Sequence, residues 1–110
     1  MDIIFKSRKL GALCNSQSAM QRDLGARLAK VLRRRLDDLD AAATLEVMRH
    51  LPGRCHELVE DRAGQLAVDL EHPKRLVFEP SHEIKPVKAD GGLDWAGVTA
   101  IRILEIVDYH

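Results

Sequence analysis

The residues with the clearest chemical potential are arginines, histidines and a tyrosine in the second half of the chain. They are Arg54, His56, Arg62, Arg75, Tyr109 and His110. Histidine and tyrosine can act as acid or base, and the planar guanidinium of arginine can donate two parallel hydrogen bonds to a phosphate. Cleaving RNA through its own 2′-hydroxyl needs a base, an acid for the leaving 5′-oxygen and a cation for the charge on phosphorus. These residue types could supply all of them without a metal ion or other cofactor.

Other reactive side chains form weaker patterns. His50, Cys55 and His56 do not match the spacing of a usual zinc site. Cys14 and Cys55 are far apart and belong to no CxxC motif, so we expect reduced, structural thiols. The chain also lacks a glycine-rich phosphate loop. We therefore predict neither a metal nor a cofactor.

The stretch 65–80, QLAVDLEHPKRLVFEP, predicts a hairpin that would hold Arg75. Leu66, Val68 and Leu70 alternate with Gln65, Ala67 and Asp69, as in a strand with one buried face. Pro73 predicts the turn, because it cannot donate to a ladder. In the second strand Leu76 and Phe78 point inward, while Arg75, Val77 and Glu79 point outward. The outer face would thus present Arg75 beside Ala67 and Asp69, as a candidate anion ligand.

The first part of the chain reads as a strand followed by helices. Residues 3–5 are apolar and partly β-branched, which favours a strand, and Ser7 precedes a short helical segment. Ser18 and Gln21 resemble a capping box ahead of one long helix that runs to about Ala42. Its apolar stripe, expected against the sheet, is Met20, Leu24, Leu28, Val31, Leu32, Leu36 and Leu39. The opposite side carries Arg22, Arg27, Lys30, Arg33 and Arg34.

Short strands and turns dominate the remainder. Thr44 could cap a helical turn through Met48, residues 56–59 suggest a strand, and residues 61–64 suggest a hairpin turn. Residues 81–92 read as a surface loop, and Asp94 could cap a turn that includes Trp95. Residues 99–107 form an apolar, β-branched strand. Simple alternation puts Ile101, Ile103, Glu105, Val107 and Tyr109 on one face of that strand, and Arg102, Leu104, Ile106, Asp108 and His110 on the other.

These elements predict an α+β fold. The N-terminal strand and the helices would pack on one face of a twisted, mainly antiparallel sheet of about four to five strands. With 110 residues the chain fits a single domain, residues 1–110. It has neither an apolar run long enough for a membrane span nor the features of a secretory signal, so we expect a cytoplasmic protein.

Charge is distributed unevenly along the chain. Residues 1–36 carry nine Lys or Arg against two Asp or Glu, a net charge of +7, and the remaining residues carry −7. The basic part could meet a nucleic acid or an acidic protein, or it could be a solvated helix face. A general RNA-binding module is less favoured, because the sequence shows no aromatic stacking platform.

The run LPGRCHELVEDRAGQLAVDLEHPKRLVFEP over residues 51–80, together with the closing IVDYH, resembles the plasmid-maintenance system killer proteins, the HigB branch of the RelE-like toxins. The similarity extends over nearly the whole chain. It implies the RelE-like toxin fold and the toxin of a type II toxin-antitoxin pair. Such a toxin is an endoribonuclease that enters the ribosomal A site and cuts messenger RNA during translation. The implied partners are a HigA-like antitoxin, the ribosome and mRNA.

The resemblance also implies roles for individual residues. Arg75 would clamp the phosphate, His56 or His110 would transfer protons, and Tyr109 would stack on a base or position the nucleotide. We further assign RNA binding to Arg54, Arg62, Lys74 and Asp108. The candidates for antitoxin or ribosome contact are Arg27, Lys30 and Arg34.

Two positions depart from the family pattern. Val59-Glu60 stands where Lys-Gly is common, and Lys74 stands where an aromatic residue is common. A lysine that could help bind phosphate is thus absent, and Glu60 adds a negative charge near the expected RNA path. The alternative function is a catalytically weakened toxin homologue that persists as an antitoxin-binding or co-repressor subunit.

Overall fold

The structure, a computed structural model, describes residues 1–108 and places helices against one face of a five-stranded sheet. The strand order is β1-β5-β4-β3-β2. The strands are β1 (Asp2–Phe5), β2 (His56–Glu57), β3 (Leu66–Asp69), β4 (Lys74–Pro80) and β5 (Ala100–Asp108). All neighbours pair antiparallel except β1, which runs parallel to β5. This confirms the α+β prediction.

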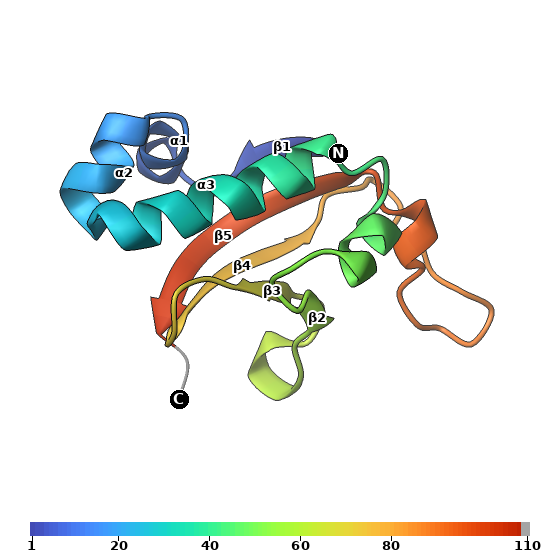
Figure 1. The fold of residues 1–110 in the computed structure, drawn as a ribbon. Coiled ribbons are helices and arrows are strands. Elements are labelled where there is room, and N and C mark those ends of the chain that lie inside the picture. Colours follow the sequence, from blue (N-terminus) through green and yellow to red (C-terminus); the bar gives the residue numbers. More distant parts are fainter. Residues whose placement is uncertain (109–110) are drawn as a thin grey trace.

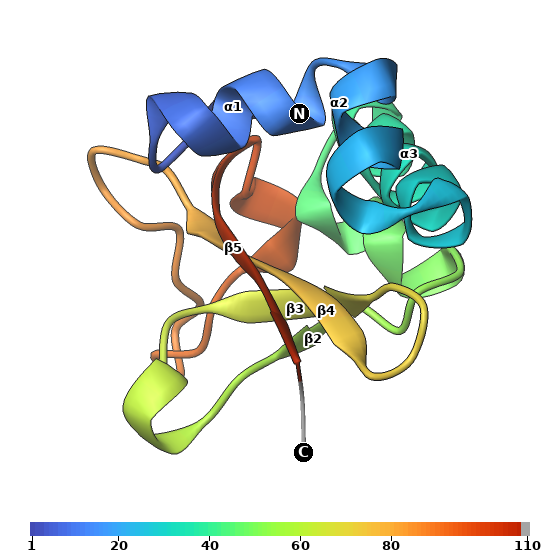
Figure 2. The same ribbon diagram turned by 90° about the vertical axis from the view of Figure 1, so that its left-hand side faces the viewer.

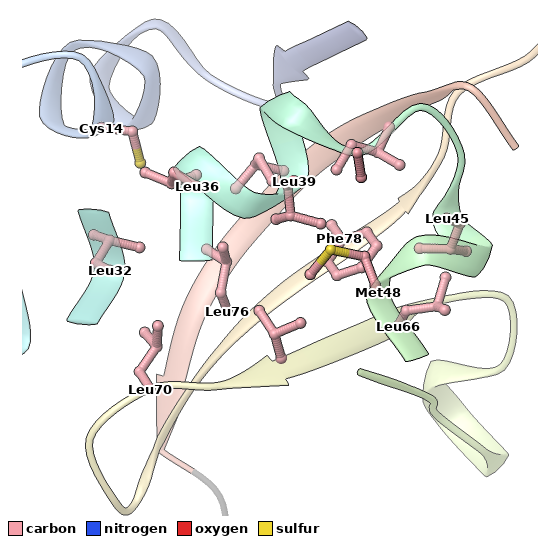
Figure 3. Packing of buried hydrophobic residues seen from close by; sticks show 14 of the residues in the cluster. Cys14, Leu32, Leu36, Leu39, Leu45, Met48, Leu66, Leu70, Leu76 and Phe78 are labelled. Carbon is pink, nitrogen blue, oxygen red and sulfur yellow. The ribbon is translucent and has the colours of Figure 1, made fainter. Parts of the chain in front are cut away.

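The helices form one layer over the sheet (Figures 1 and 2). They are α1 (Arg8–Cys14), α2 (Gln17–Leu24) and α3 (Ala26–Ala41), followed by a 3-10 helix, Leu45–His50. Leu28, Leu32, Leu36 and Leu39 of α3 are buried, as the apolar stripe predicts. They pack against inward side chains of the sheet such as Leu76 and Phe78 (Figure 3). In residues 1–108 no helix is both long and apolar enough to cross a membrane.

The single long helix of the sequence analysis is two helices. Gly25 lies between α2 and α3. Its φ of 85° is a backbone conformation that residues with a side chain disfavour, and it interrupts the helix. The predicted cap at Ser18 is also wrong, because Ser16 is the N-cap and its side chain accepts a hydrogen bond from the Ala19 amide at 3.2 Å. The 3.6-residue periodicity continues across the break, so the apolar pattern alone could not reveal it.

The predicted hairpin is present. Asp69 lies opposite Arg75, and Val68 lies opposite Leu76. The turn contains a cis peptide bond before Pro73. Leu66, Val68, Leu76 and Phe78 are fully buried in the core below the helices, as the alternation predicts.

The predicted alternation of the last strand is wrong for residues 105–108, because β5 contains a bulge. Val77 pairs with Glu105, but the next residue of β4, Phe78, pairs with Ile103. Leu104 is therefore an extra residue, and residues 105–108 lie on the opposite face from the one they would occupy in a regular strand. Ile106 contacts the main core, whereas Glu105 and Val107 share the outer face with Arg75. A second small cluster on that face contains Ala67, Val77 and Leu104, with Leu58 and Val107 against it.

The strand expected over residues 56–59 is shorter than predicted. β2 ends at Glu57, and a 3-10 helix, Glu60–Arg62, occupies the start of the connection to β3. Glu60 has φ of 57°, in the region that favours glycine. Thr44 and Asp94 precede 3-10 helices as predicted, but neither side chain makes a capping hydrogen bond.

Candidate active site

The candidate site begins at a turn with unusual backbone conformation. Gly53 has φ of 110° and Arg54 has φ of 52°. The Gly53 carbonyl accepts a hydrogen bond from the Asp69 amide at 2.7 Å. Arg35 of α3 donates to the Asp69 carbonyl at 2.7 Å and lies so close to Gly53 that a Cβ there would be 2.6 Å from its Nε. The turn is thereby fixed between α3 and β3, and a side chain at position 53 would have to displace the Arg35 side chain and would strain the backbone.

Asp69 joins two of the predicted arginines. Its carboxylate accepts from Arg54 Nε at 2.9 Å and lies 3.1 Å from Arg75 Nε. The Arg75 side chain is only 13% exposed, so its charge is partly removed from water. Burial acts to raise the pKa of Asp69, but the hydrogen bond and charge of Arg54 and the charges of Arg75 and His56 outweigh it and hold that pKa below its usual value. Asp69 therefore stays ionised and fixes both guanidinium groups.

His56 lies on β2, opposite Ala67 of β3, with its ring in a defined orientation. Its Nδ1 is 2.7 Å from the Arg54 carbonyl oxygen. Because a carbonyl can only accept, Nδ1 carries the proton, and in the neutral ring Nε2 is the basic atom. Nε2 lies 3.5 Å from an Arg75 terminal nitrogen. An imidazole nitrogen and a guanidinium group are thus side by side, with the histidine oriented by a backbone carbonyl.

A small cavity adjoins these residues at the hairpin turn. Its volume is about 120 Å³, room for a few water molecules or a phosphate group. The lining residues are Arg54, Asp69, Leu70, His72, Pro73, Lys74 and Arg75. Lys74 pairs with Asp108 across β4 and β5, so both of these predicted RNA-binding residues lie beside Arg75. Three of the seven lining residues are Arg or Lys and one, Asp69, is a carboxylate, so the lining carries a net positive charge that suits an anion.

Arg62 occupies a different part of the same sheet face. It donates to Gln65 at 2.9 Å and to Glu105 at 3.2 Å. Glu105 is opposite Val77, further along β4 from Arg75. Arg62 is therefore held by Gln65 and Glu105, apart from the group that Asp69 forms with Arg54 and Arg75.

The three basic residues predicted to contact a macromolecule are exposed on α3. Arg27, Lys30 and Arg34 face solvent, and Arg27 forms an ion pair with Glu71 of the hairpin turn at 3.0 Å. This ion pair places Arg27, at the start of α3, beside the hairpin turn that lines the small cavity. Tyr109 and His110, predicted as catalytic, lie outside the described residues.

The cysteines do not contribute a nucleophile to this geometry. Burial raises the pKa of Cys55 to about 12 and that of Cys14 to about 11, against the opposing charges of Arg49 and Arg33. Both thiols are free. Among residues 1–108 no three His, Cys, Asp or Glu side chains are arranged to hold a metal ion. Asp69 is the central residue that the sequence-based site omitted, although its position beside Arg75 in the hairpin was predicted.

Comparison with solved structures identifies the fold. A YoeB/ParE toxin from Agrobacterium tumefaciens matches with a TM-score of 0.61 and 13% identity over 100% of both chains. The chain has the RelE-like toxin fold. A YoeB-YefM complex from Staphylococcus aureus matches with a TM-score of 0.58 and 15% identity, and the YoeB dimer from the same organism with 0.55 and 18%. Each match covers 100% of this chain and 97% of the other.

Sequence comparison adds no family assignment to this fold. No family model matches the chain, and no curated protein matches it in sequence. Membership of the HigB branch stays a prediction. The identities to the solved structures are low, so activity has to be argued from the site itself.

Proposed function

We propose that the protein is the toxin of a type II toxin-antitoxin system and an endoribonuclease that cuts mRNA in the ribosomal A site. The observation that carries this proposal is the arrangement of His56 and Arg75. A base and a phosphate ligand adjoin on the exposed face of a rigid sheet, opposite the helices. The RelE-like fold and the family resemblance support the same class of protein.

The proposed reaction is transfer of the phosphate from the 5′-oxygen to the neighbouring 2′-oxygen. His56 Nε2 accepts the 2′-hydroxyl proton while the 2′-oxygen attacks phosphorus. Arg75 stabilises the additional negative charge on the phosphate oxygens. An acid donates a proton to the departing 5′-oxygen, and the products are a 2′,3′-cyclic phosphate and a 5′-hydroxyl. Because the geometry suits His56 as the base, we assign the acid to His110 and nucleotide positioning to Tyr109.

Asp69 and Arg54 position the reacting groups without taking part in the proton or phosphate transfer. Asp69 holds Arg75 through Nε, and the Arg54 carbonyl selects the tautomer of His56. We propose that Arg54, Lys74 and the small cavity bind the RNA backbone beside the cleaved bond. Arg62 would contact the strand further along the sheet.

The partners of the proposed toxin follow from its charge and its fold. The exposed Arg27, Lys30 and Arg34 suit ribosomal RNA or an acidic segment of an antitoxin. The Staphylococcus aureus YoeB was solved with YefM, which supports an antitoxin as partner for this chain. We propose a HigA-like antitoxin and a cytoplasmic location on the basis of the family resemblance.

Expression of the chain without an antitoxin tests the proposal. The intact protein should arrest translation and leave new mRNA 5′ ends, detected by primer extension. Arg75→Ala should reduce cleavage by about a hundredfold or more, the scale expected for loss of a charge-stabilising group. Arg22→Ala is the matched control, because Arg22 is exposed on α2 and pairs only with its neighbour Asp23 among residues 1–108. Uncut mRNA and normal growth, with the folded protein present, would contradict the proposal.

A weakened toxin is the second candidate, and two features favour it. The carboxylate of Asp69 already occupies the Nε groups of Arg54 and Arg75, and so competes with a phosphate. Val59 is 73% exposed next to Glu60, where the family pattern has Lys-Gly. If activity has decayed for this reason, the double substitution Val59→Lys with Glu60→Gly should restore mRNA cleavage. Stable antitoxin binding without cleavage by the natural sequence would support this candidate.

A further inference from the structure

The outer edge of β1 carries backbone groups that no strand within residues 1–108 uses. The amides of Asp2 and Lys6 donate to the carbonyls of Thr99 and Ile103 at 3.0 and 2.9 Å. Backbone groups alternate in direction along a strand, so those of Ile3 and Phe5 face away from β5. β1 pairs with β5 alone and is therefore an open edge, of the kind that pairs with other chains.

The space beside this edge is open. A shallow groove of about 690 Å³ lies along β1 and is bordered on its other side by α1. Gly11 of α1 lies beside the Phe5 ring, and a Cβ added at this position would be 3.4 Å from the ring. The groove is lined by residues 3–8 with Gly11, Ala12 and Asn15. An additional strand thus has access to the outward groups of β1.

The side chains of β1 and its flank are self-complementary. Asp2, Ile4 and Lys6 are exposed on the outer face, with Ile4 52% exposed, while Ile3 and Phe5 pack on the core. The exposed residues therefore run acidic, apolar, basic. In an antiparallel pair centred on Ile4, Asp2 of each copy faces Lys6 of the other, and the two Ile4 side chains meet.

The same register satisfies the backbone. Ile3 of one copy lies opposite Phe5 of the other, and outward-facing residues in this position exchange both hydrogen bonds of a ladder pair. The Ile4 and Asp2–Lys6 positions then form the closer pairs, where side-chain interactions are strongest. Parallel pairing in register would instead place Asp2 beside Asp2 and Lys6 beside Lys6. Charge thus selects the antiparallel, twofold arrangement.

We propose that β1 pairs with β1 of a second copy of this chain, so that the sheet continues across a twofold axis. A twofold interface needs a surface that is complementary to itself, and the segment Asp2 to Lys6 has this property. The proposal is independent of the proposed nuclease activity. It places the outer faces of both copies, with their Arg75 residues, on the same side of one continuous sheet.

Sedimentation of the purified chain against concentration tests the proposal. The natural sequence should approach twice its 12.3 kDa mass at high concentration. Asp2→Lys alone and Lys6→Asp alone each create like-charge pairs across the axis, and each should weaken self-association by about tenfold or more. An equimolar mixture of these two variants restores both opposite-charge pairs and should recover dimers of mixed composition. Lys88→Asp, at an exposed loop position, is the matched control and should leave the dimer unchanged.

The outcomes separate this interface from others. A mass of 12.3 kDa at every concentration would overturn the proposal, as it would leave the edge for a different protein's strand. A dimer that is insensitive to either single substitution would place the interface elsewhere. Failure of the mixture to recover dimers, with both variants folded by circular dichroism, would refute the Asp2–Lys6 register. Because Asp2 and Lys6 are exposed, we expect both variants to fold.

Discussion

Asp69→Asn should destabilise the protein in a pH-dependent way, because this carboxylate holds two arginines. The ion pair with Arg54 is well exposed on the arginine side and should contribute about 0.5 kcal/mol. The contact with Arg75 involves a largely buried guanidinium and should contribute about 1.5 kcal/mol. Asparagine retains a hydrogen-bond acceptor, so the expected loss at pH 7 is about 1–2 kcal/mol in the free energy of unfolding. This corresponds to a fall in Tm of about 5–10 °C for a chain of this size.

The pH dependence has a definite sign. The pKa of Asp69 in the folded protein is lower than its ordinary value of 3.8, which applies to the unfolded chain. The contribution of the Asp69 carboxylate to the free energy of unfolding is therefore complete above pH 5, and it is lost as the pH falls through the pKa of Asp69 in the folded protein. The difference between the natural protein and Asp69→Asn should be greatest near neutral pH and should vanish in strong acid. Urea unfolding at a series of pH values measures it.

A control substitution and a double-mutant cycle show whether the loss of stability comes from the contact between Asp69 and Arg75. Asp23→Asn removes an exposed pair with Arg22 and should cost less than about 0.5 kcal/mol. Arg75→Gln, alone and combined with Asp69→Asn, should reveal a coupling energy of about 1 kcal/mol between the two residues. Equal stability of Asp69→Asn and Asp23→Asn at pH 7, or a difference that persists in strong acid, would refute the reasoning.

Two further predictions concern the backbone at Glu60 and the buried thiols. Glu60→Gly should raise the free energy of unfolding by up to about 1 kcal/mol in urea titrations, because glycine adopts the positive φ at position 60 without strain. Glu57→Gly within β2 should lower the free energy of unfolding, and a lower value for Glu60→Gly would contradict the inferred backbone strain. Burial raises the pKa of Cys55 to about 12, so its thiolate fraction should be about a thousandfold below that of a thiol whose pKa is 9.0. The folded protein should therefore react with Ellman's reagent far more slowly at pH 8 than the unfolded chain, and rapid reaction of the folded protein would refute the inferred burial of Cys55.

The sequence was most informative where one face of an element is buried. Leu66, Val68, Leu76 and Phe78 followed period-two alternation and fixed both the hairpin and the outward position of Arg75. Failures came from backbone geometry that side-chain patterns do not encode. The break at Gly25 preserved the helical period on either side.

The candidate site was predictable in its residue types but not in its contacts. The proximity of His56 and Arg75 depends on the pairing of β2 with β3 and of β3 with β4, and the hairpin alternation indicated only the second. Arg54 joins them through a positive φ that no pattern predicts for an arginine. Asp69 was placed beside Arg75 by the hairpin, yet its role requires knowing that Arg54 reaches the same carboxylate. Long-range neighbours of this kind are set by the tertiary fold.

The extra residue at Leu104 makes the length of β5 as important as its composition. Residues 105–108 alternate with the opposite parity, which turns Ile106 to the core and pairs Val107 with Arg75. A deletion at this point would exchange those two environments even if every remaining residue were unchanged. A single-residue insertion or deletion in β5 is therefore expected to disturb the candidate site more than a single substitution, because it moves each of residues 105–108 to the opposite face of the sheet.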